Sequence, residues 1–301
     1  MAQQSLSSSH EAYKNAFQTY SANSTVGDAI RNYAREAAAY IMKKMERNIP
    51  VFRVLGIGSG DGKPDLEILH AVARSLLSSG DENQKPLMHL CIVEPSSSLI
   101  ADFKQAVSPL PEKVATLADV SFEWHEATFQ EFISYSLPDR SKYHMIYFIA
   151  SLFYMDAEKS LNYCFKNLAV GGAMFCLVAG TDFNYFVKQS RKFQGRLNCL
   201  SVSNFHLYIA KDLIAIAERN NWKYEELPTK DYEVDITSCF DKSSHTGGLL
   251  LDFLTHQIDF RETADPALYS DVITFITENS SSDNEGRKKL RSEMAIVVIY
   301  K

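Results

Sequence analysis

The chain has 301 residues, 46% of them hydrophobic, and a formal net charge of −6 at pH 7. A chain of this length and composition can bury one large core or two modest ones. The negative charge argues against a nucleic-acid-binding surface, which requires a basic face. The N-terminus lacks a signal-peptide pattern and no apolar run reaches the length of a membrane span, so we expect a cytoplasmic protein without a membrane partner.

The cysteine usage fits a reducing compartment. The five cysteines have no C-x-x-C spacing and are odd in number, which argues against a disulfide framework. They are Cys91, Cys164, Cys176, Cys199 and Cys239. The eight histidines form no ligand set with them, so we expect no metal site and, in the absence of H-x-E with partner cysteines, no zinc deaminase.

Strands and helices alternate through the first half of the chain. Apolar residues at helical spacing predict two N-terminal helices, at 11–22 and 28–47. Five strands are predicted after them, at 52–57, 87–93, 120–124, 143–150 and 173–179. Helices are predicted between them at 65–77, 96–107 and 158–168. This alternation predicts an α/β fold with a doubly wound, mostly parallel sheet.

The second half is less regular. Residues 182–196 are rich in aromatic side chains, and 209–218 and 248–254 have helical patterns. Strands are predicted at 223–227, 231–240 and 293–300, and the polar segment 280–286 is expected to be mobile. Late strands after an aromatic insertion predict an antiparallel edge and a small substrate-binding lid.

The most informative segment is V-F-R-V-L-G-I-G-S-G-D-G at 51–62, which predicts a buried strand followed by a tight turn. It lacks the G-x-G-x-x-G spacing of dinucleotide folds and contains no P-loop. Every second residue from Gly56 to Gly62 is glycine. This resembles the first motif of class I S-adenosylmethionine-dependent methyltransferases, acid-x-G-x-G-x-G, with Gly56 in place of the acid. The competing interpretation is an ordinary strand-to-helix turn.

Glu94 is the expected partner of this turn. It follows the predicted strand 87–93, and a polar segment at 78–83 separates that strand from the helix before it. A carboxylate at this place can accept hydrogen bonds from two ribose hydroxyls. Gly58, Ser59, Gly60 and Glu94 therefore predict a site for an adenine nucleoside.

The other predicted site residues follow the ends of later strands, because ligands of doubly wound sheets bind beyond the carboxyl ends of the strands. Thr128 and Phe129 are expected to flank the adenine, and Ile149 and Ala150 to lie where the methyl group is presented. An aromatic pocket for a flat or cationic substrate is predicted from Phe153, Tyr154, Phe183, Phe186, Phe193 and Phe253. Core packing is the competing interpretation for each of these rings.

No catalytic acid or base is expected. Methyl transfer from a sulfonium to a neutral nitrogen requires mainly alignment of the reactants and exclusion of water. No catalytic triad is visible in the sequence.

From its N-terminal region to its last strand, the chain resembles the histamine N-methyltransferase family. The matching residues are Tyr13, Phe17, 23–25, 55–60, 65–69, Val93, Glu94, Pro95, Ser96, Trp124, His125, 152–154, 235–240, 249–255 and the final apolar strand. The resemblance implies a single class I methyltransferase domain, 1–301, with a Rossmann-like seven-stranded sheet. It also implies N-terminal helices at 1–48 that cover the active site, a cofactor-binding core at about 49–180, and a lid with the C-terminal strands at about 181–301. It further implies that S-adenosylmethionine is the cofactor and that the enzyme is a monomer acting on a small molecule.

The cofactor positions carry over from the resemblance. Gly58 matches the glycine turn, Glu94 the ribose acid and Ile149 the backbone site after the fourth strand. Phe129 stands where the family has a serine near adenine, and Leu99 replaces a glutamine near the ribose. Both replacements are tolerable, because packing and backbone groups can hold adenine.

The polar substrate positions do not carry over. Val26 replaces a family glutamate that holds the amine, Ala150 replaces a glutamine, and Ser292 replaces an asparagine. Loss of the glutamate would leave a bound ammonium unpaired. The aromatic wall remains, with Tyr13, Phe153, Tyr154, Phe193 and Phe253, and Cys199 at a family cysteine position.

The function implied is N-methylation of an imidazole or aromatic amine, histamine-like or carnosine-like. The alternatives are O- or S-methylation of a small aromatic molecule, or a relative that binds the cofactor without catalysis.

Overall fold

The computed structural model describes residues 4–45, 49–78, 84–135, 142–197 and 206–301, so Cys199 and most of the predicted loop 78–83 lie outside it. The chain divides into two compact units. Unit 1 comprises Met1–Ala29, Ala179–Leu207 and Thr229–Met294. Unit 2 comprises Ile30–Val178, Tyr208–Pro228 and Ala295–Lys301.

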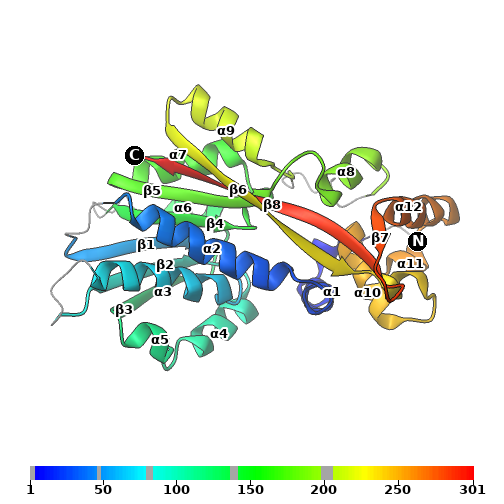
Figure 1. The fold of residues 1–301 in the computed structure, drawn as a ribbon, viewed down its shortest axis with the longest axis horizontal. Coiled ribbons are helices and arrows are strands. Elements are labelled where there is room, and N and C mark those ends of the chain that lie inside the picture. Colours follow the sequence, from blue (N-terminus) through cyan, green and yellow to red (C-terminus); the bar gives the residue numbers. More distant parts are fainter. Residues whose placement is uncertain (1–3, 46–48, 79–83, 136–141, 198–205) are drawn as a thin grey trace. The chain divides into compact units, whose positions relative to one another are not determined.

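Unit 2 is built on a parallel sheet, which confirms the predicted fold class. Its first five strands are β1 (Val51–Ile57), β2 (Leu87–Val93), β3 (Asp119–His125), β4 (Tyr143–Ile149) and β5 (Leu168–Ala179). The strand order is β3-β2-β1-β4-β5-β8-β6, with β6 at Lys223–Asp235 and β8 at Lys288–Tyr300 (Figure 1). The pairs β1–β2, β1–β4, β2–β3 and β4–β5 are all parallel. Their carboxyl ends therefore meet at one edge.

Helices cover both faces of this sheet, as a doubly wound fold requires. On one face, α6 (Phe129–Tyr135), α7 (Ala157–Asn167) and α9 (Ala210–Arg219) share a buried core with Leu55, Cys91 and Ile146. On the other face, α3 (Lys63–Leu77) and α4 (Ser97–Ala106) pack through contacts such as Phe103 against Trp124 at 5.2 Å between ring centroids. The short helix α5 (Glu112–Ala115) precedes β3, and α2 (Val26–Met42) and α3 cross the near face of the sheet in Figure 1.

Several predicted boundaries were wrong. The two strands predicted at 223–227 and 231–240 are one strand, β6, which continues through Pro228 and ends at Asp235. A proline lacks an N–H but is tolerated in an edge strand, and β6 is the last strand in the sheet order. Helix α2 ends at Met42 rather than at 47, and β5 begins at Leu168 rather than at 173.

Unit 1 is mainly helical. It contains α1 (His10–Ala22), α8 (Tyr185–Lys192), α10 (His245–Thr255), α11 (Phe260–Thr263) and α12 (Pro266–Glu278). Helix α12 was not predicted from the sequence, although Asp265 caps it through the N–H groups of Ala267 and Leu268. The segment at 280–286, expected to be mobile, instead contains β7 (Ser280–Ser282), which pairs antiparallel with β8. Within the described residues, no helix combines the length and apolarity needed to cross a membrane.

The glycine that ends the turn before α3 is fixed by both conformation and space. Gly62 has φ of +74°, and an added Cβ would lie 2.1 Å from the ring of Phe103. We expect Gly62→Ala to lower the free energy of unfolding by about 2–4 kcal/mol, from left-handed strain and overpacking together. Urea denaturation would measure this loss.

Gly60→Ala is the matched control. Gly60 has φ of +58°, but an added Cβ would meet no heavy atom within 4 Å. In this variant the free energy of unfolding should fall by about 1–2 kcal/mol, because only the strain of the left-handed backbone conformation is added. Equal losses in the two variants would contradict the steric role of Phe103.

Candidate functional site

The glycine turn closes over the carboxyl ends of β1 and β4. Gly58 has φ of +66°, and an added Cβ would lie 2.5 Å from the Cβ of Ser151. The buried Ser151 hydroxyl donates to the carbonyl oxygen of Ile57 at 2.6 Å. The Gly58 N–H donates to the carbonyl oxygen of Val93 at 2.8 Å, which ties the turn to β2. Ser151 was not predicted from sequence as part of this turn.

Glu94 connects the turn to the start of α4. Its side chain is buried, and its Oε2 accepts from the N–H of Gly60 at 2.9 Å. Its Oε1 accepts from the N–H of Ser96 at 2.9 Å, which places Pro95 in a tight turn between them. Each carboxylate oxygen can accept a further hydrogen bond, so the group can still receive two hydroxyls.

These residues fit the ribose of an adenine nucleoside. An added Cβ on Gly60 would meet open space, so the side of the turn next to Glu94 has room for a ligand. Ser96 caps α4 by accepting from the N–H of Leu99 at 3.4 Å, and Leu99 lies half-buried in the first turn of that helix. The structure thus brings Gly58, Gly60, Glu94, Ser96 and Leu99 together at one end of the sheet.

Thr128 and Phe129 have structural roles at the start of α6. The Thr128 hydroxyl donates to the carboxylate of Glu131 at 2.7 Å and accepts from the N–H of Glu131 at 3.2 Å. The hydroxyl holds the pKa of Glu131 below its usual range. The Phe129 ring is buried against Phe148 at 5.9 Å and Tyr163 at 5.7 Å between centroids, so it fills the core.

The end of β4 has an unusual backbone conformation. Ile149 is buried, and Ala150 has φ of +51°, a left-handed value that few non-glycine residues adopt. Its N–H donates to the carbonyl oxygen of Leu177 at 3.1 Å, which holds the chain in place. Such strain is often found at ligand sites. Phe153 and Tyr154 follow, with ring centroids 5.1 Å apart.

Unit 1 contains a separate aromatic cluster. Tyr13, Phe17 and Tyr20 of α1 meet Phe253 of α10 with centroid distances of 6.3, 5.7 and 4.3 Å. Phe186 of α8 lies 6.3 Å from Phe253 at an interplanar angle of 89°. Tyr20 was missed as a site residue, although its helical spacing from Tyr13 and Phe17 indicated the shared face.

Two other predicted pocket rings lie elsewhere. Phe193 is fully buried and packs edge-to-face on Phe275 at 5.5 Å, so it belongs to the core of unit 1. Phe183 is 77% exposed and has the amine of Lys188 over its ring at 5.7 Å. Within unit 1, the structure groups Phe186 and Phe253 of this predicted set with residues of α1.

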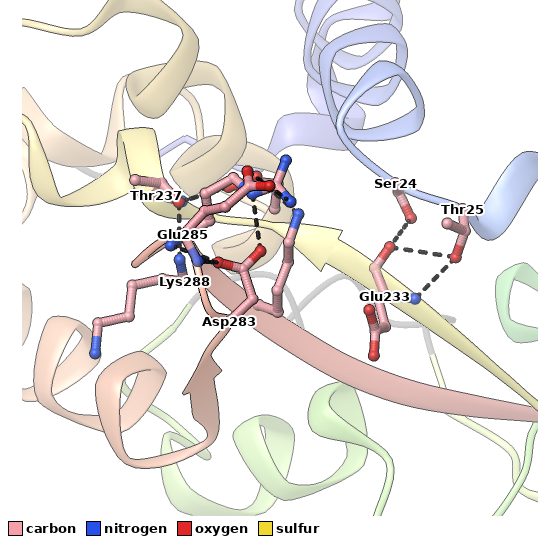
Figure 2. A network of polar contacts seen from close by, with 10 residues as sticks. Ser24, Thr25, Glu233, Thr237, Asp283, Glu285 and Lys288 are labelled. Carbon is pink, nitrogen blue, oxygen red and sulfur yellow. Dashed lines mark hydrogen bonds and ion pairs between the residues drawn. The ribbon is translucent and has the colours of Figure 1, made fainter.

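Val26 is held in place by the segment before it. The Ser24 hydroxyl accepts from the Val26 N–H at 3.0 Å and donates to the Glu233 carbonyl oxygen at 3.0 Å. The Thr25 N–H also donates to that oxygen at 2.9 Å, and the Thr25 hydroxyl accepts from the Glu233 N–H at 2.9 Å. Figure 2 shows Ser24 and Thr25 directed at Glu233. Val26 itself is buried at the start of α2.

Ser292 is a second buried position among the altered anchors. Its hydroxyl has no hydrogen-bond partner among the described residues.

Burial raises the pKa values of Tyr20 and Tyr232 above the usual range, so neither phenol can serve as a base at neutral pH. Glu293, which follows Ser292, accepts a short hydrogen bond from the Thr181 hydroxyl.

Three potential metal ligands lie together although the sequence predicted no metal site. Ligand atoms of Cys91, Glu123 and His125 are within 4.8 Å of one another. Sequence spacing does not reveal this group, because its members come from neighbouring strands β2 and β3. The Glu123 carboxylate contacts the rings of His89 at 3.2 Å and His125 at 2.9 Å.

Comparison with known proteins shows which proteins this chain is similar to. No protein-family model matches the chain. It is 27% identical to histamine N-methyltransferase B of Xenopus laevis over 300 residues, covering 98% of this chain and 97% of the relative. It is 26% identical to carnosine N-methyltransferase 2 of Gallus gallus, covering 96% and 86% of the two chains.

Solved structures share the fold. Loganic acid methyltransferase with SAH has a TM-score of 0.51 at 14% identity, covering 91% of this chain and 93% of that one. A cyclopropane-fatty-acyl-phospholipid synthase-like protein from Lactobacillus casei has a TM-score of 0.52 at 16% identity, covering 90% and 91%. The chain thus has the class I methyltransferase fold and is similar over nearly its whole length to the histamine N-methyltransferase family.

Proposed function

We propose that the chain is an N-methyltransferase that transfers the methyl group of S-adenosylmethionine to a small imidazole-containing or aromatic amine. The observation that carries the proposal is the full-length similarity to both histamine and carnosine N-methyltransferases. It is supported by the glycine turn and Glu94, which fit the nucleoside of the cofactor. S-adenosylmethionine is the methyl donor, and the acceptor is a small molecule.

The described residues favour a nitrogen acceptor. A hydroxyl acceptor would require a base, and the buried phenols of Tyr20 and Tyr232 have raised pKa values. A neutral amine or imidazole carries its own lone pair and requires only alignment with the methyl group. The aromatic cluster of Tyr13, Phe17 and Phe253 offers flat surfaces on which such a ring can stack.

We further propose that the acceptor differs from histamine in its charge. Val26 and Ser292 are buried where the resemblance places polar anchors, and Ala150 takes the place of a third. A carnosine-like acceptor, in which the amine lies far from the imidazole or is masked, would not need a carboxylate at position 26.

We also place the enzyme in the cytosol, as a monomer. Cys91, Cys164, Cys176 and Cys239 are free and buried, which suits a reducing compartment.

The proposal is tested by methyl-transfer assays over a panel of imidazoles, amines and phenols, with S-adenosylhomocysteine binding measured alongside. We expect turnover with a nitrogen acceptor and saturable binding of S-adenosylhomocysteine. Turnover with phenols or thiols alone would contradict N-methylation. Product binding without turnover of any acceptor would indicate a non-catalytic relative, and absence of product binding would contradict the methyltransferase assignment.

Replacement of Glu94 tests the ribose assignment. We expect Glu94→Ala to weaken S-adenosylhomocysteine binding by about 1–3 kcal/mol, because charge-assisted hydrogen bonds are lost. Calorimetry would measure the change. Glu123→Ala removes an exposed carboxylate from the neighbouring strand β3 and should leave the affinity unchanged. Equal affinities of the native chain and Glu94→Ala would show that the ribose binds elsewhere.

Replacement of Val26 tests the charge of the acceptor. We expect Val26→Glu to lower KM for histamine by about tenfold relative to the native chain, because a carboxylate pairing with an ammonium contributes about 1–2 kcal/mol in a partly buried site. Val26→Gln is the neutral control of equal size and should not lower KM. An equal effect of both variants would assign the change to volume rather than charge.

A further inference from the structure

The glycine turn lacks an acid at Gly56, and the structure shows what occupies the space beneath it. A Cβ added to Gly56 would lie 2.6 Å from the Ser59 hydroxyl oxygen and 2.9 Å from Oδ1 of Asp65. It would also lie 2.9 Å from the ring of Tyr147. No side chain can therefore replace hydrogen at position 56 without displacing these groups. A carboxyl group is present beneath the turn, but it comes from helix α3 rather than from strand β1.

Asp65 is held in this place by the Tyr147 hydroxyl, and the nearby Ser59 hydroxyl also lowers its pKa. Its side chain is fully buried in the first turn of α3, and the Tyr147 hydroxyl donates to its Oδ1 at 2.6 Å. Its Oδ2 is buried with no hydrogen-bond partner among the described residues. A buried acid with one unused oxygen is costly unless that oxygen serves another group.

The pKa of the Asp65 carboxyl group is raised toward neutral pH. Burial raises the pKa of Asp65 to about 7, although the hydrogen bond from Tyr147 opposes the rise. The carboxylate of Asp61 in the turn raises it slightly further and is itself paired with Lys63 at 2.7 Å. Glu94 faces the same turn, through the N–H of Gly60, from the end of β2. A pKa raised in this way makes the charge of Asp65 sensitive to a ligand cation bound nearby.

We propose that Asp65 supplies from α3 the acid that the turn lacks at Gly56, and that its ionisation favours S-adenosylmethionine over S-adenosylhomocysteine. The inference rests on the proposed function, because it assumes that this cofactor binds at the turn. The two ligands share their nucleoside, amino and carboxylate groups, but only the methyl donor carries a sulfonium charge. An ionised carboxylate beneath the turn attracts that charge, whereas a neutral carboxyl group does not.

The direction of the effect follows from linkage. A ligand cation stabilises the ionised form, so binding of S-adenosylmethionine lowers the pKa of Asp65 and releases a proton. Its affinity should therefore rise with pH until Asp65 is ionised in the unliganded protein. S-adenosylhomocysteine lacks the sulfonium charge, so its affinity should depend less on pH. The dissociation constant of S-adenosylhomocysteine divided by that of S-adenosylmethionine should therefore increase between pH 6 and pH 8.

Titration calorimetry on the full chain tests this directly, with both ligands at pH 6, 7 and 8. In the native chain we expect preference for S-adenosylmethionine to increase by about three- to tenfold over this range, since one unit of pKa shift corresponds to a factor of ten. Asp65→Asn keeps the shape of the side chain but removes its charge, so the ratio of the two ligands' dissociation constants should become independent of pH. Asp61→Asn is the matched control and should retain the dependence.

A second variant and a second measurement keep the test decisive if Asp65→Asn fails to fold. Tyr147→Phe removes the hydrogen bond that favours ionised Asp65, so the change in ligand preference should move to higher pH. Calorimetry in two buffers of different ionisation enthalpy should also detect proton release when S-adenosylmethionine binds. Fewer protons should be released when S-adenosylhomocysteine binds.

The possible outcomes separate this inference from the proposed function. The same pH dependence for both ligands in the native chain, or a dependence that survives in Asp65→Asn, would overturn the role of Asp65 and leave the methyltransferase assignment intact. Failure of the native chain to bind either ligand would instead overturn the proposed function.

Discussion

The buried carboxylate of Glu94 is the interaction that ties the glycine turn to the start of α4. Its two oxygens accept hydrogen bonds from Gly60 in the turn and from Ser96 at the start of α4. A buried charge is tolerated only when such bonds compensate for its lost hydration. The parallel register of Ile57 with Val93 brings the turn and the acid to the same edge of the sheet. Glu94 therefore shapes the turn in addition to offering acceptors to a ribose.

The space beneath that turn imposes a second constraint, which couples Gly56 to Asp65. A Cβ at position 56 would already lie 2.9 Å from Oδ1 of Asp65, so an acid there would place a second carboxyl group close to the first, and like charges oppose each other's ionisation. The chain has room for one acid, and Asp65 with its partner Tyr147 already fills that room. The absence of an acid at Gly56 is thus not the loss of a feature, because the carboxyl group reaches the same space from another element.

The strands of unit 2 were predictable, because apolar runs covered on both faces leave a clear pattern in sequences such as 87–93 and 143–149. Glycine spacing likewise predicted the tight turn after β1, where Gly58, Gly60 and Gly62 have positive φ. The helix α6 could have been found from Thr128 and Glu131, which have the spacing of a capping box.

Tertiary context decided the features that the sequence did not reveal. Continuous pairing across Pro228 depends on β6 lying at the sheet edge. Asp65 has the pattern of an ordinary first-turn acid of a helix, and only its burial beside Tyr147 distinguishes it. The aromatic rings of the second half looked alike in sequence, yet Phe193 is core, Phe183 is exposed and Phe253 stacks on Tyr20.

Two acids lie next to Tyr232 and Ser292 in the sequence, and both already have partners. The side chain of Glu233, which follows Tyr232, pairs with Arg291 at 3.0 Å, and the carboxylate of Glu293 accepts from Thr181. Neither is available to replace a glutamate at Val26 without losing its present partner. An ammonium placed beside buried Val26 would lose hydration without gaining a counter-charge, which costs several kcal/mol. A neutral ring would lose less hydration than an ammonium at the same place, which is the physical basis of the proposed preference.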